Sequence, residues 1–538
     1  MPDSPNLLTL LSELPEQRQQ RPFAWRDGKP LSHAWLAAQV AAWRRLLSAH
    51  AGLRFALYSS DAAAFACILL GAWQAGKTVY LPGDVLPATC ASLGTLVDGY
   101  LGDFPPQCAP LTDAALTAAE AGGARPAFQA LQPDFPGLVI YTSGSTGEPQ
   151  AVPKVLSQLA AEVATLELLF GGRMGNADVV ATVSHQHIYG LLFKVLWPLA
   201  AGRAMHARQL DYLEEFQPQP GAKPVVLVSS PAHLKRLPAA FSAGQAAAIC
   251  TIFSSGGPLP PEVAAAAGHA LGSVPVEVYG SSETGGVAWR QRRAGTDDSW
   301  QVMPAVAWRV AADDVLEIRS PHLPDAGWHA LADQVQAVDR QHFRLKGRVD
   351  RIVKVEEKRI SLDALERQLT TMAQVADARV LLVDQPESQQ RQRIAAFVVL
   401  SAAGADILAA QGKLALNRLL RDGMAHAVEA IALPRSWRYL DALPVNAQGK
   451  TTRADLLALL QPQAGADLAE APRKPAERLL EQEPHRVLME LTVPADLLNS
   501  TATSRARRSC LAWCSSTGRS AMAVATSFWR RNSSACSA

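Results

Sequence analysis

The chain has 538 residues, a length that predicts two or more domains because a single hydrophobic core rarely grows so large. Hydrophobic residues make up 48% and charged residues 19%, and the net charge of +2 suggests neither a nucleic-acid-binding nor a membrane-binding surface. No apolar run reaches the roughly 18 residues of a membrane span. Seven scattered cysteines argue against a disulfide framework, and none forms a C-x-x-C zinc pair. The first residues lack a signal-peptide pattern, so we expect a cytoplasmic location.

The first third of the chain alternates helical and strand patterns. Residues 32–50 carry apolar side chains at helical spacing. Residues 54–58 and 78–81 have strand patterns, and residues 61–74 between them form an apolar helix that Asp61 can cap. This order of strand, helix and strand predicts a parallel sheet covered by helices.

Several later apolar runs end in polar loops that contain glycine. We expect strands at residues 137–141, 179–183, 225–229, 248–253 and 274–279, and a helix at residues 157–170. In open α/β sheets, ligands bind beyond the carboxyl ends of the strands. The loops after these runs are therefore the predicted ligand site.

From about residue 302 the elements become shorter. We expect strands at 308–310, 315–318, 334–338, 378–383, 393–400 and 437–440, and helices at 361–371 and 411–429. The predicted domains are an N-terminal domain over residues 1–346, a small α+β domain over 347–460, a linker over 461–484 and a tail over 485–538.

Residues 141–154 read Y-T-S-G-S-T-G-E-P-Q-A-V-P-K and follow one of the predicted strands. Glycines let backbone N–H groups turn toward an anion, and the hydroxyls add further donors, so this loop has the chemistry of a phosphate cradle. An ordinary polar surface turn has the same composition.

Four more stretches follow in order: residues 255–258 (S-G-G-P), 279–283 (Y-G-S-S-E), 347–350 (G-R-V-D) with Lys354, and 443–453 (L-P-V-N-A-Q-G-K-T-T-R). With residues 141–154, they resemble the motifs of the adenylate-forming superfamily, which includes acyl-CoA synthetases, luciferases and nonribosomal adenylation domains. The resemblance covers roughly residues 20–460. It implies an α/β fold with a large N-terminal AMP-binding domain of mixed sheets and helices, and a small, mobile α+β lid that hinges near Asp350.

The resemblance also implies a two-step reaction. A carboxylic acid, aromatic or fatty, attacks the α-phosphate of ATP to give an acyl adenylate, and a thiol of coenzyme A or of an acyl carrier protein then displaces AMP. Phosphoryl transfer of this kind depends on positioning and positive charge. Mg²⁺ is the expected metal, with Glu283 as its protein ligand.

The implied roles of the site residues follow the motifs. Phosphates would be held by Thr142, Ser143, Gly144, Ser145, Thr146 and Gly147. The adenine would be held by Gly256, Gly257, Pro258, Tyr279, Gly280, Ser281 and Ser282. Asp333, in a degenerate W-x-x-T-G-D motif, would bind the ribose, and Arg348 the ribose or a phosphate. Asp350 would be the hinge. Lys450 would be the main catalytic residue. Glu283 and His187 would also take part, and His187 would lie on the wall of the acyl pocket.

Several positions depart from the family pattern. Gln150 and Ala151 replace a Lys-Gly pair, and Lys154 is the open alternative for the missing phosphate contact. Leu331 and Ala332 replace threonine and glycine in the ribose motif. Glu357 stands where the family has glycine near the thiol tunnel, and its charge favours the phosphopantetheine arm of a carrier protein over coenzyme A.

These departures leave a second hypothesis open, a degenerate adenylating fold that serves as a non-catalytic scaffold. Retention of Glu283, Asp350 and Lys450 argues against it. A P-loop kinase or ATPase is excluded, because Pro444 stands where the motif before Gly449-Lys450-Thr451 requires glycine.

The tail has two parts. Residues 485–498 alternate like a strand, whereas the remainder has the composition of a disordered segment. A neighbouring reading frame over residues 500–522 can encode F-D-G-H-F-P-G-A-P-V-L-P-G-V-V-Q-L-D-W-A-I-G-Y, which resembles a hot-dog-fold 3-hydroxyacyl-carrier-protein dehydratase. We therefore expect a frameshifted dehydratase remnant, a pairing that resembles those of polyketide and aryl-polyene pathways.

Overall fold

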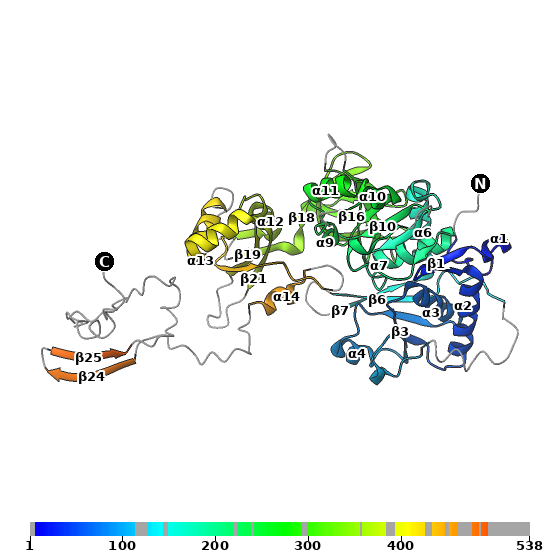
Figure 1. The fold of residues 1–538 in the computed structure, drawn as a ribbon, viewed down its shortest axis with the longest axis horizontal. Coiled ribbons are helices and arrows are strands. Elements are labelled where there is room, and N and C mark those ends of the chain that lie inside the picture. The colour runs from blue at the N-terminus through cyan, green and yellow to red at the C-terminus, as the bar shows by residue number, and fades with distance from the viewer. Residues whose placement is uncertain are drawn as a thin grey trace. The chain divides into compact units, whose positions relative to one another are not determined.

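The computed structural model describes residues 6–112, 127–143, 149–218, 223–237, 241–292, 298–355, 358–383, 393–424, 433–446, 451–460, 476–483 and 486–492. The chain divides into two compact units, Met1–Leu460 and Gln461–Ala538. Figure 1 shows the order of the elements along the chain. Within the described part of the chain, no helix has both the length and the apolar character needed to cross a membrane.

A five-stranded sheet contains the two strands that flank the glycine-rich segment. Its order is β5 (Gly99–Gly102), β3 (Arg54–Tyr58), β4 (Thr78–Leu81), β6 (Leu138–Ser143) and β7 (Pro149–Lys154). The first four strands pair in parallel, and β6 and β7 form an antiparallel pair. The predicted parallel βαβ unit is confirmed, because α3 (Ala62–Gln74) connects β3 to β4. The Asp61 carboxylate caps α3 by accepting a hydrogen bond from the backbone N–H of Ala64 at 2.8 Å.

A larger mixed sheet carries the other predicted strand ends. Its thirteen strands are ordered β15 (Ala307–Val310), β16 (Val315–Arg319), β17 (His329–Ala337), β18 (His342–Arg348), β14 (Trp300–Val302), β13 (Gly285–Gln291), β12 (Val276–Ser281), β11 (Ile249–Ser254), β10 (Val225–Ser229), β8 (Asp178–Ala181), β9 (Met205–His206), β1 (Pro22–Arg26) and β2 (Lys29–Ser32). The strands β8, β10, β11 and β12 are parallel neighbours. β8 and β10 are buried along their whole length, as expected for strands covered on both faces.

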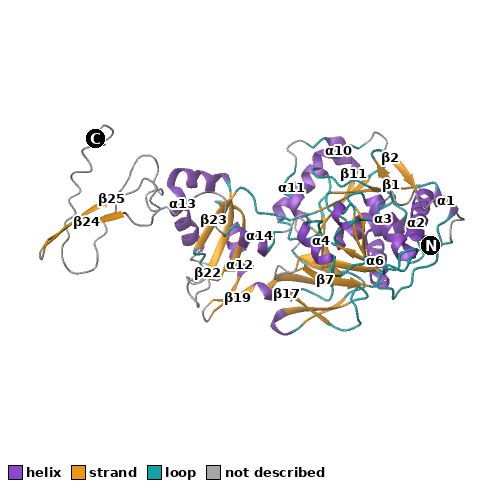
Figure 2. Ribbon diagram, turned by 90° about the horizontal axis from the view of Figure 1, so that it is seen from below, coloured by secondary structure: helices purple, strands orange, loops and turns teal. Residues whose placement is uncertain are grey.

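Helices cover these sheets (Figure 2). They are α1 (Glu16–Gln19), α2 (His33–Ser48), α4 (Pro87–Leu93), α6 (Leu156–Met174), α7 (Ile188–Gly190), α8 (Trp197–Ala201), α9 (Pro231–Leu234), α10 (Ala243–Ala248) and α11 (Pro261–Leu271), with a π-helical turn η2 (Leu191–Leu196) between α7 and α8. Phe170 of α6, Phe193 of η2 and Phe253 of β11 pack edge to face, with ring centroids 5.0–5.2 Å apart between Phe253 and the other two. This aromatic cluster joins α6 and η2 to the parallel strands.

The segment after β18 builds the expected small α+β arrangement. Its elements are β19 (Ile352–Val355), β20 (Lys358–Ser361), α12 (Leu362–Thr370), β21 (Val375–Val383), β22 (Arg393–Leu400), α13 (Ala402–Met424), β23 (Ser436–Leu440) and α14 (Arg453–Ala458). Strands β21, β22 and β23 form one sheet. Leucines of α12 and α13, among them Leu365, Leu369, Leu416 and Leu420, share a core with Val380 and Val398 of that sheet.

The fold class expected from the sequence is confirmed, and several elements begin or end a few residues away from their predicted bounds. α13 is broken at Gly412, whose φ of +80° is not helical. Its second part begins close to the predicted residue 411, whereas the alanine-rich part that begins at Ala402 was not predicted. Within residues 461–484, which were expected to be a linker, Ala476–Glu483 forms β24, which pairs antiparallel with β25 (Arg486–Thr492). The domain bounds and the linker stay predictions. Residues 493–538 lie outside the described residues, so the dehydratase remnant stays a prediction.

Candidate functional site

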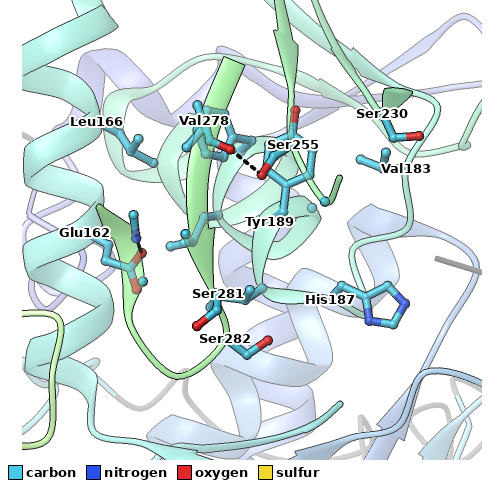
Figure 3. A pocket seen from close by; sticks show the side chains of 18 of the residues that line it. Glu162, Leu166, Val183, His187, Tyr189, Ser230, Ser255, Val278, Ser281 and Ser282 are labelled. Carbon is cyan, nitrogen blue, oxygen red and sulfur yellow. Dashed lines mark hydrogen bonds between the residues drawn. The ribbon is translucent and has the colours of Figure 1, made fainter. Parts of the chain in front are cut away.

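A cavity of about 170 Å³ lies where the four parallel strands of the large sheet end, between α6 and the α7–η2 segment (Figure 3). Each parallel strand supplies residues at or just after its carboxyl end. They are Thr182, Val183 and Ser184 after β8, Ser230 after β10, Ser255 and Gly256 after β11, and Gly280, Ser281 and Ser282 at the end of β12. The cavity therefore has the position at which open α/β sheets bind ligands.

Five residues expected from the sequence line this cavity: His187, Gly256, Gly280, Ser281 and Ser282. Two of them require glycine. The backbone of Gly256 has φ +89°, and a Cβ at Gly280 would lie 2.2 Å from the carbonyl oxygen of Gly285. The structure thus explains these glycines by backbone geometry, and it brings the two predicted adenine segments to one cavity.

The ends of β11 and β12 are tied together by side-chain hydrogen bonds. The hydroxyl of Ser255 donates to the carbonyl of Val278 at 2.8 Å, drawn as the dashed line in Figure 3. The backbone N–H of Ser281 donates to the Thr284 hydroxyl at 3.0 Å, and the N–H of Thr284 donates to the Ser281 hydroxyl at 3.2 Å. These bonds fix the turn that carries Ser282 and Glu283.

Tyr279, Asp333 and Arg348, which the sequence assigned to adenine and ribose binding, lie together. Asp333 of β17 and Arg348 of β18 are paired residues of the sheet, and Arg348 Nη1 lies 3.6 Å from Asp333 Oδ2. Burial raises the pKa of Tyr279, and the charge of Asp333 raises it further. Tyr279 therefore stays a neutral phenol beside a carboxylate that is itself paired with a guanidinium group.

Glu283 occupies the turn between β12 and β13, and its side chain is exposed. Its carbonyl oxygen accepts a hydrogen bond from Lys154 Nζ at 3.0 Å, and the same ammonium group donates to the carbonyl of His322 at 3.2 Å. Burial lowers the pKa of Lys154, whereas the charges of Glu162 and Glu283 raise it. Lys154 is 1% exposed, so it braces the Glu283 turn from inside and is not a free cation beside the glycine-rich loop.

The remaining predicted residues are described only in part or lie off the cavity. Thr142 and Ser143 end β6 as backbone, whereas Gly144, Ser145, Thr146 and Gly147 lie outside the described residues. Lys450 and Glu357 also lie outside them. Asp350 belongs to a single 3₁₀ turn, Val349–Arg351. Gly257 and Pro258 follow Gly256 without lining the cavity.

Sequence reasoning missed a buried polar wall formed by Glu162, Thr165 and His322. The imidazole Nδ1 of His322 donates to the carbonyl of Gly286 at 3.1 Å, and its Nε2 lies 3.3 Å from the Thr165 hydroxyl. Burial lowers the pKa of His322, which favours the neutral ring. One signal existed in the sequence: Gln158, Glu162 and Thr165 recur at positions i, i+4 and i+7 of an otherwise apolar helix face.

Comparisons with known proteins agree with the fold. A family model described as AMP-binding enzyme matches residues 95–322. The 4-coumarate–CoA ligase of Rhodobacter capsulatus is 30% identical over 321 residues, which cover 58% of this chain and 74% of that protein. The 4-chlorobenzoate–CoA ligase of an Arthrobacter species is 24% identical over 392 residues, covering 65% and 70% of the two chains.

A solved structure has the same fold. The ATP-bound RpMatB–BxBclM chimera B1 superposes with a TM-score of 0.71 at 18% sequence identity, over 85% of this chain and 99% of that one. At this identity the match establishes the fold alone. The family model and the relatives above show that the chain belongs to the AMP-binding enzyme family and is an AMP-forming acid–thiol ligase.

Proposed function

We propose that the chain activates a single-ring aromatic acid with ATP and transfers the acyl group to the thiol of a phosphopantetheine arm. The observation that carries this proposal is the cavity at the strand ends, which has nucleotide-type backbone turns on one side and apolar side chains on another. An ATP-dependent acid ligase has to bind the nucleotide and the acid side by side, because a carboxylate oxygen must approach the α-phosphorus in line with the bond that breaks.

The size and lining of the cavity support a ring as the acyl group. Its volume of about 170 Å³ is close to the roughly 150 Å³ of an engineered apolar cavity that binds benzene. Apolar side chains from three elements line it, including Leu166 of α6, Val183 after β8 and Phe193 of η2. A long fatty chain would need more room, so an aromatic acid is favoured over a fatty one.

The nucleotide side is proposed from the residues that the structure brings together. The paired Asp333 and Arg348 support ribose recognition, since a carboxylate held by a guanidinium group keeps lone pairs for two hydroxyl donors. Glycines at 256 and 280 support a flat adenine slot, because they let backbone approach a planar base. The phosphates would lie at the glycine-rich loop that joins β6 to β7.

The exposed Glu283 carboxylate suits Mg²⁺. The described residues hold no cluster of three or more potential metal ligands, and Mg²⁺ is commonly bound by one or two carboxylates together with substrate phosphates. When bound, the ion would supply positive charge beside the phosphates. Lys154 holds the backbone of this turn, so the chain itself fixes where the Glu283 carboxylate can reach.

In the first step, a carboxylate oxygen of the acid forms a bond to the α-phosphorus as the bond from that phosphorus to the pyrophosphate oxygen breaks. In the second step, the thiolate bonds to the acyl carbon and AMP leaves with the electron pair. Lys450 is proposed to offset the charge that builds on the α-phosphate. Residues 347–460, hinged at Asp350, are the proposed lid that carries Lys450.

The relatives named above are CoA ligases, which supports coenzyme A as one acceptor. Glu357, where the family has glycine, supports a carrier protein instead, because an added carboxylate repels the phosphates of coenzyme A. Parallel assays of thioester formation with coenzyme A and with a phosphopantetheinylated carrier protein separate these two acceptors.

Carboxylate-dependent ATP–pyrophosphate exchange over a panel of benzoates, cinnamates and fatty acids tests the proposal. We expect exchange with aromatic acids, its loss in Lys450→Ala and its retention in Lys29→Ala, which removes an exposed lysine of β2. If the folded chain binds ATP but exchanges with no acid, the scaffold hypothesis takes the place of this proposal.

A further inference from the structure

The cavity wall contains a buried carboxylate, Glu162, that the reaction proposed above does not use. Glu162 lies in the middle of α6, is 3% exposed and lines the cavity together with Thr165 and Leu166 of the same helix. Its Oε1 atom is buried and has no hydrogen-bond partner among the described residues. A buried acceptor without a partner is costly, so its retention needs an explanation.

Backbone geometry fixes the position of this carboxylate. Its Oε2 accepts a hydrogen bond from the N–H of Gly286 at 3.1 Å. Gly285, with φ +66°, lies directly against it, and a Cβ there would approach the carboxylate to 2.6–2.8 Å. Because Gly285 has no side chain, it leaves space for the Glu162 carboxylate, of which one oxygen is hydrogen-bonded and the other is not.

The surroundings of Glu162 supply positive charge but no direct donor to Oε1. The Lys154 ammonium group is close enough for the charge of Glu162 to raise its pKa, yet it donates its hydrogen bonds to the carbonyls of Glu283 and His322. The ring of His322 is occupied by Gly286 and Thr165. Neither group donates to Oε1, so the second oxygen of Glu162 is left to the cavity.

Figure 3 shows how this wall lies relative to the rest of the site. Glu162 and Leu166 project from α6 on one side of the view, His187 lies on the opposite side, and Ser281 and Ser282 lie between them. A ring in this cavity would meet apolar side chains such as Leu166 and Phe193 together with polar ones, and Glu162 is the carboxylate of the lining. A hydrogen-bond donor on the ring complements the unpartnered Oε1.

We propose that Glu162 is the specificity-determining residue for the acid, and that the acid carries a ring hydroxyl or ring amino group that donates to Glu162 Oε1. This inference rests on the proposed function and narrows its substrate class from aromatic acids to hydroxy- and amino-substituted ones. A site that keeps a buried acceptor rejects analogues without a donor much more strongly than analogues that differ in size.

The test compares kcat/KM in ATP–pyrophosphate exchange for benzoate, 3-hydroxybenzoate, 4-hydroxybenzoate, 4-aminobenzoate and 4-methoxybenzoate. Hydrogen bonds to charged groups predict that the best donor-bearing acid exceeds both benzoate and the methoxy analogue by roughly 10–100-fold. The methoxy acid fills similar space without a donor, so it separates hydrogen bonding from shape.

Two variants locate the effect at Glu162. Glu162→Met should reduce the preference over benzoate to within about 3-fold, because the acceptor is gone. Glu162→Gln keeps an acceptor oxygen without charge and should retain an intermediate preference over benzoate. If the methionine variant does not fold, the glutamine variant still tests the role of Glu162. Glu262→Met, which removes an exposed carboxylate of α11, is the matched control and should keep the full preference.

A wild-type chain that uses benzoate as well as every hydroxy and amino analogue overturns this inference and leaves the proposed function intact. The same holds if both Glu162 variants keep the wild-type preference. If no acid supports exchange in the wild-type chain, the proposed function fails and this inference fails with it.

Discussion

The large N-terminal region and the small region that follows it treat buried polarity in opposite ways. The large region buries charged or ionisable side chains that include Lys154, Glu162, Lys194 and His322, and of these Glu162 and His322 line the cavity. In the described residues between 347 and 460, every fully buried side chain is apolar. There, charged groups such as Arg351, which pairs with Asp363 and Glu366, remain partly exposed.

This difference follows from what each region has to do. Burying a polar group costs free energy unless it is paired, so a region that only has to fold keeps such groups at its edge. The large region accepts that cost beside a ligand cavity, where buried donors and acceptors can select what binds. Substitutions that remove buried polarity should therefore have larger effects there than comparable changes in the small region.

The largest expected effect is at Arg203, which holds Glu167 through two hydrogen bonds of 2.6 and 2.9 Å and also donates to the carbonyl of Gly175. Arg203→Met should lower the free energy of unfolding by roughly 3–5 kcal/mol, because it leaves the Glu167 carboxylate without its cation. Chemical denaturation measures this. Arg203→Met combined with Glu167→Gln should recover part of the loss, and a single-variant loss below about 1 kcal/mol would contradict the account.

The next largest effect is a gain, not a loss, in the free energy of unfolding. Lys194 in η2 is buried, its Nζ has no hydrogen-bond partner among the described residues, and burial lowers its pKa to about 8. Because the unfolded chain keeps this proton up to pH ~10.5, the ammonium group destabilises the fold below pH 8 by roughly 3 kcal/mol. Lys194→Met should therefore be the more stable protein at pH 7.

Measuring both proteins by thermal unfolding from pH 7 to 10.5 checks the sign. Between pH 8 and 10.5 the unfolded state binds more protons at Lys194 than the folded state does, so wild-type stability should rise relative to the variant and their difference should close. A methionine variant that is less stable at pH 7 would show that Lys194 has a compensating partner.

The smallest expected effect is the stability lost with a helix cap, which can be compared between the two regions. Ser32 caps α2 in the large region and Ser361 caps α12 in the small one, each accepting a backbone N–H at 3.2 Å. Replacing either serine by alanine should cost about 1 kcal/mol. Hydrogen exchange should show faster opening only in the helix concerned, and unequal losses of more than about 1 kcal/mol would mean that the two regions respond differently even to an identical local change.

The sequence indicated much of this arrangement where a local pattern carries the information. Alternation and apolar runs located β3, β4, β10 and β22 to the residue, and Asp61 caps its helix as predicted. The glycine and tyrosine motifs brought Gly256, Gly280 and Tyr279 into the candidate site. Such features depend on neighbouring residues, which a single sequence displays directly.

Long-range packing explains what was missed. Lys194 lies in the apolar run Leu-Leu-Phe-Lys-Val-Leu, where a lysine ordinarily reaches solvent, and only the packing around η2 buries it. The contact of Glu162 with Gly285 joins positions more than a hundred residues apart, and no spacing rule connects them. The polar wall of the cavity therefore became visible only in three dimensions.

The central claim is that the cavity joins an aromatic acid to AMP. The most direct measurement mixes the chain with ATP labelled at the α-phosphate, Mg²⁺ and 4-hydroxybenzoate, without any thiol, and identifies the labelled product by mass spectrometry. We expect an acid-dependent aroyl adenylate with release of pyrophosphate. Label found in ADP, or no acid-dependent product from folded protein that binds ATP, would contradict it.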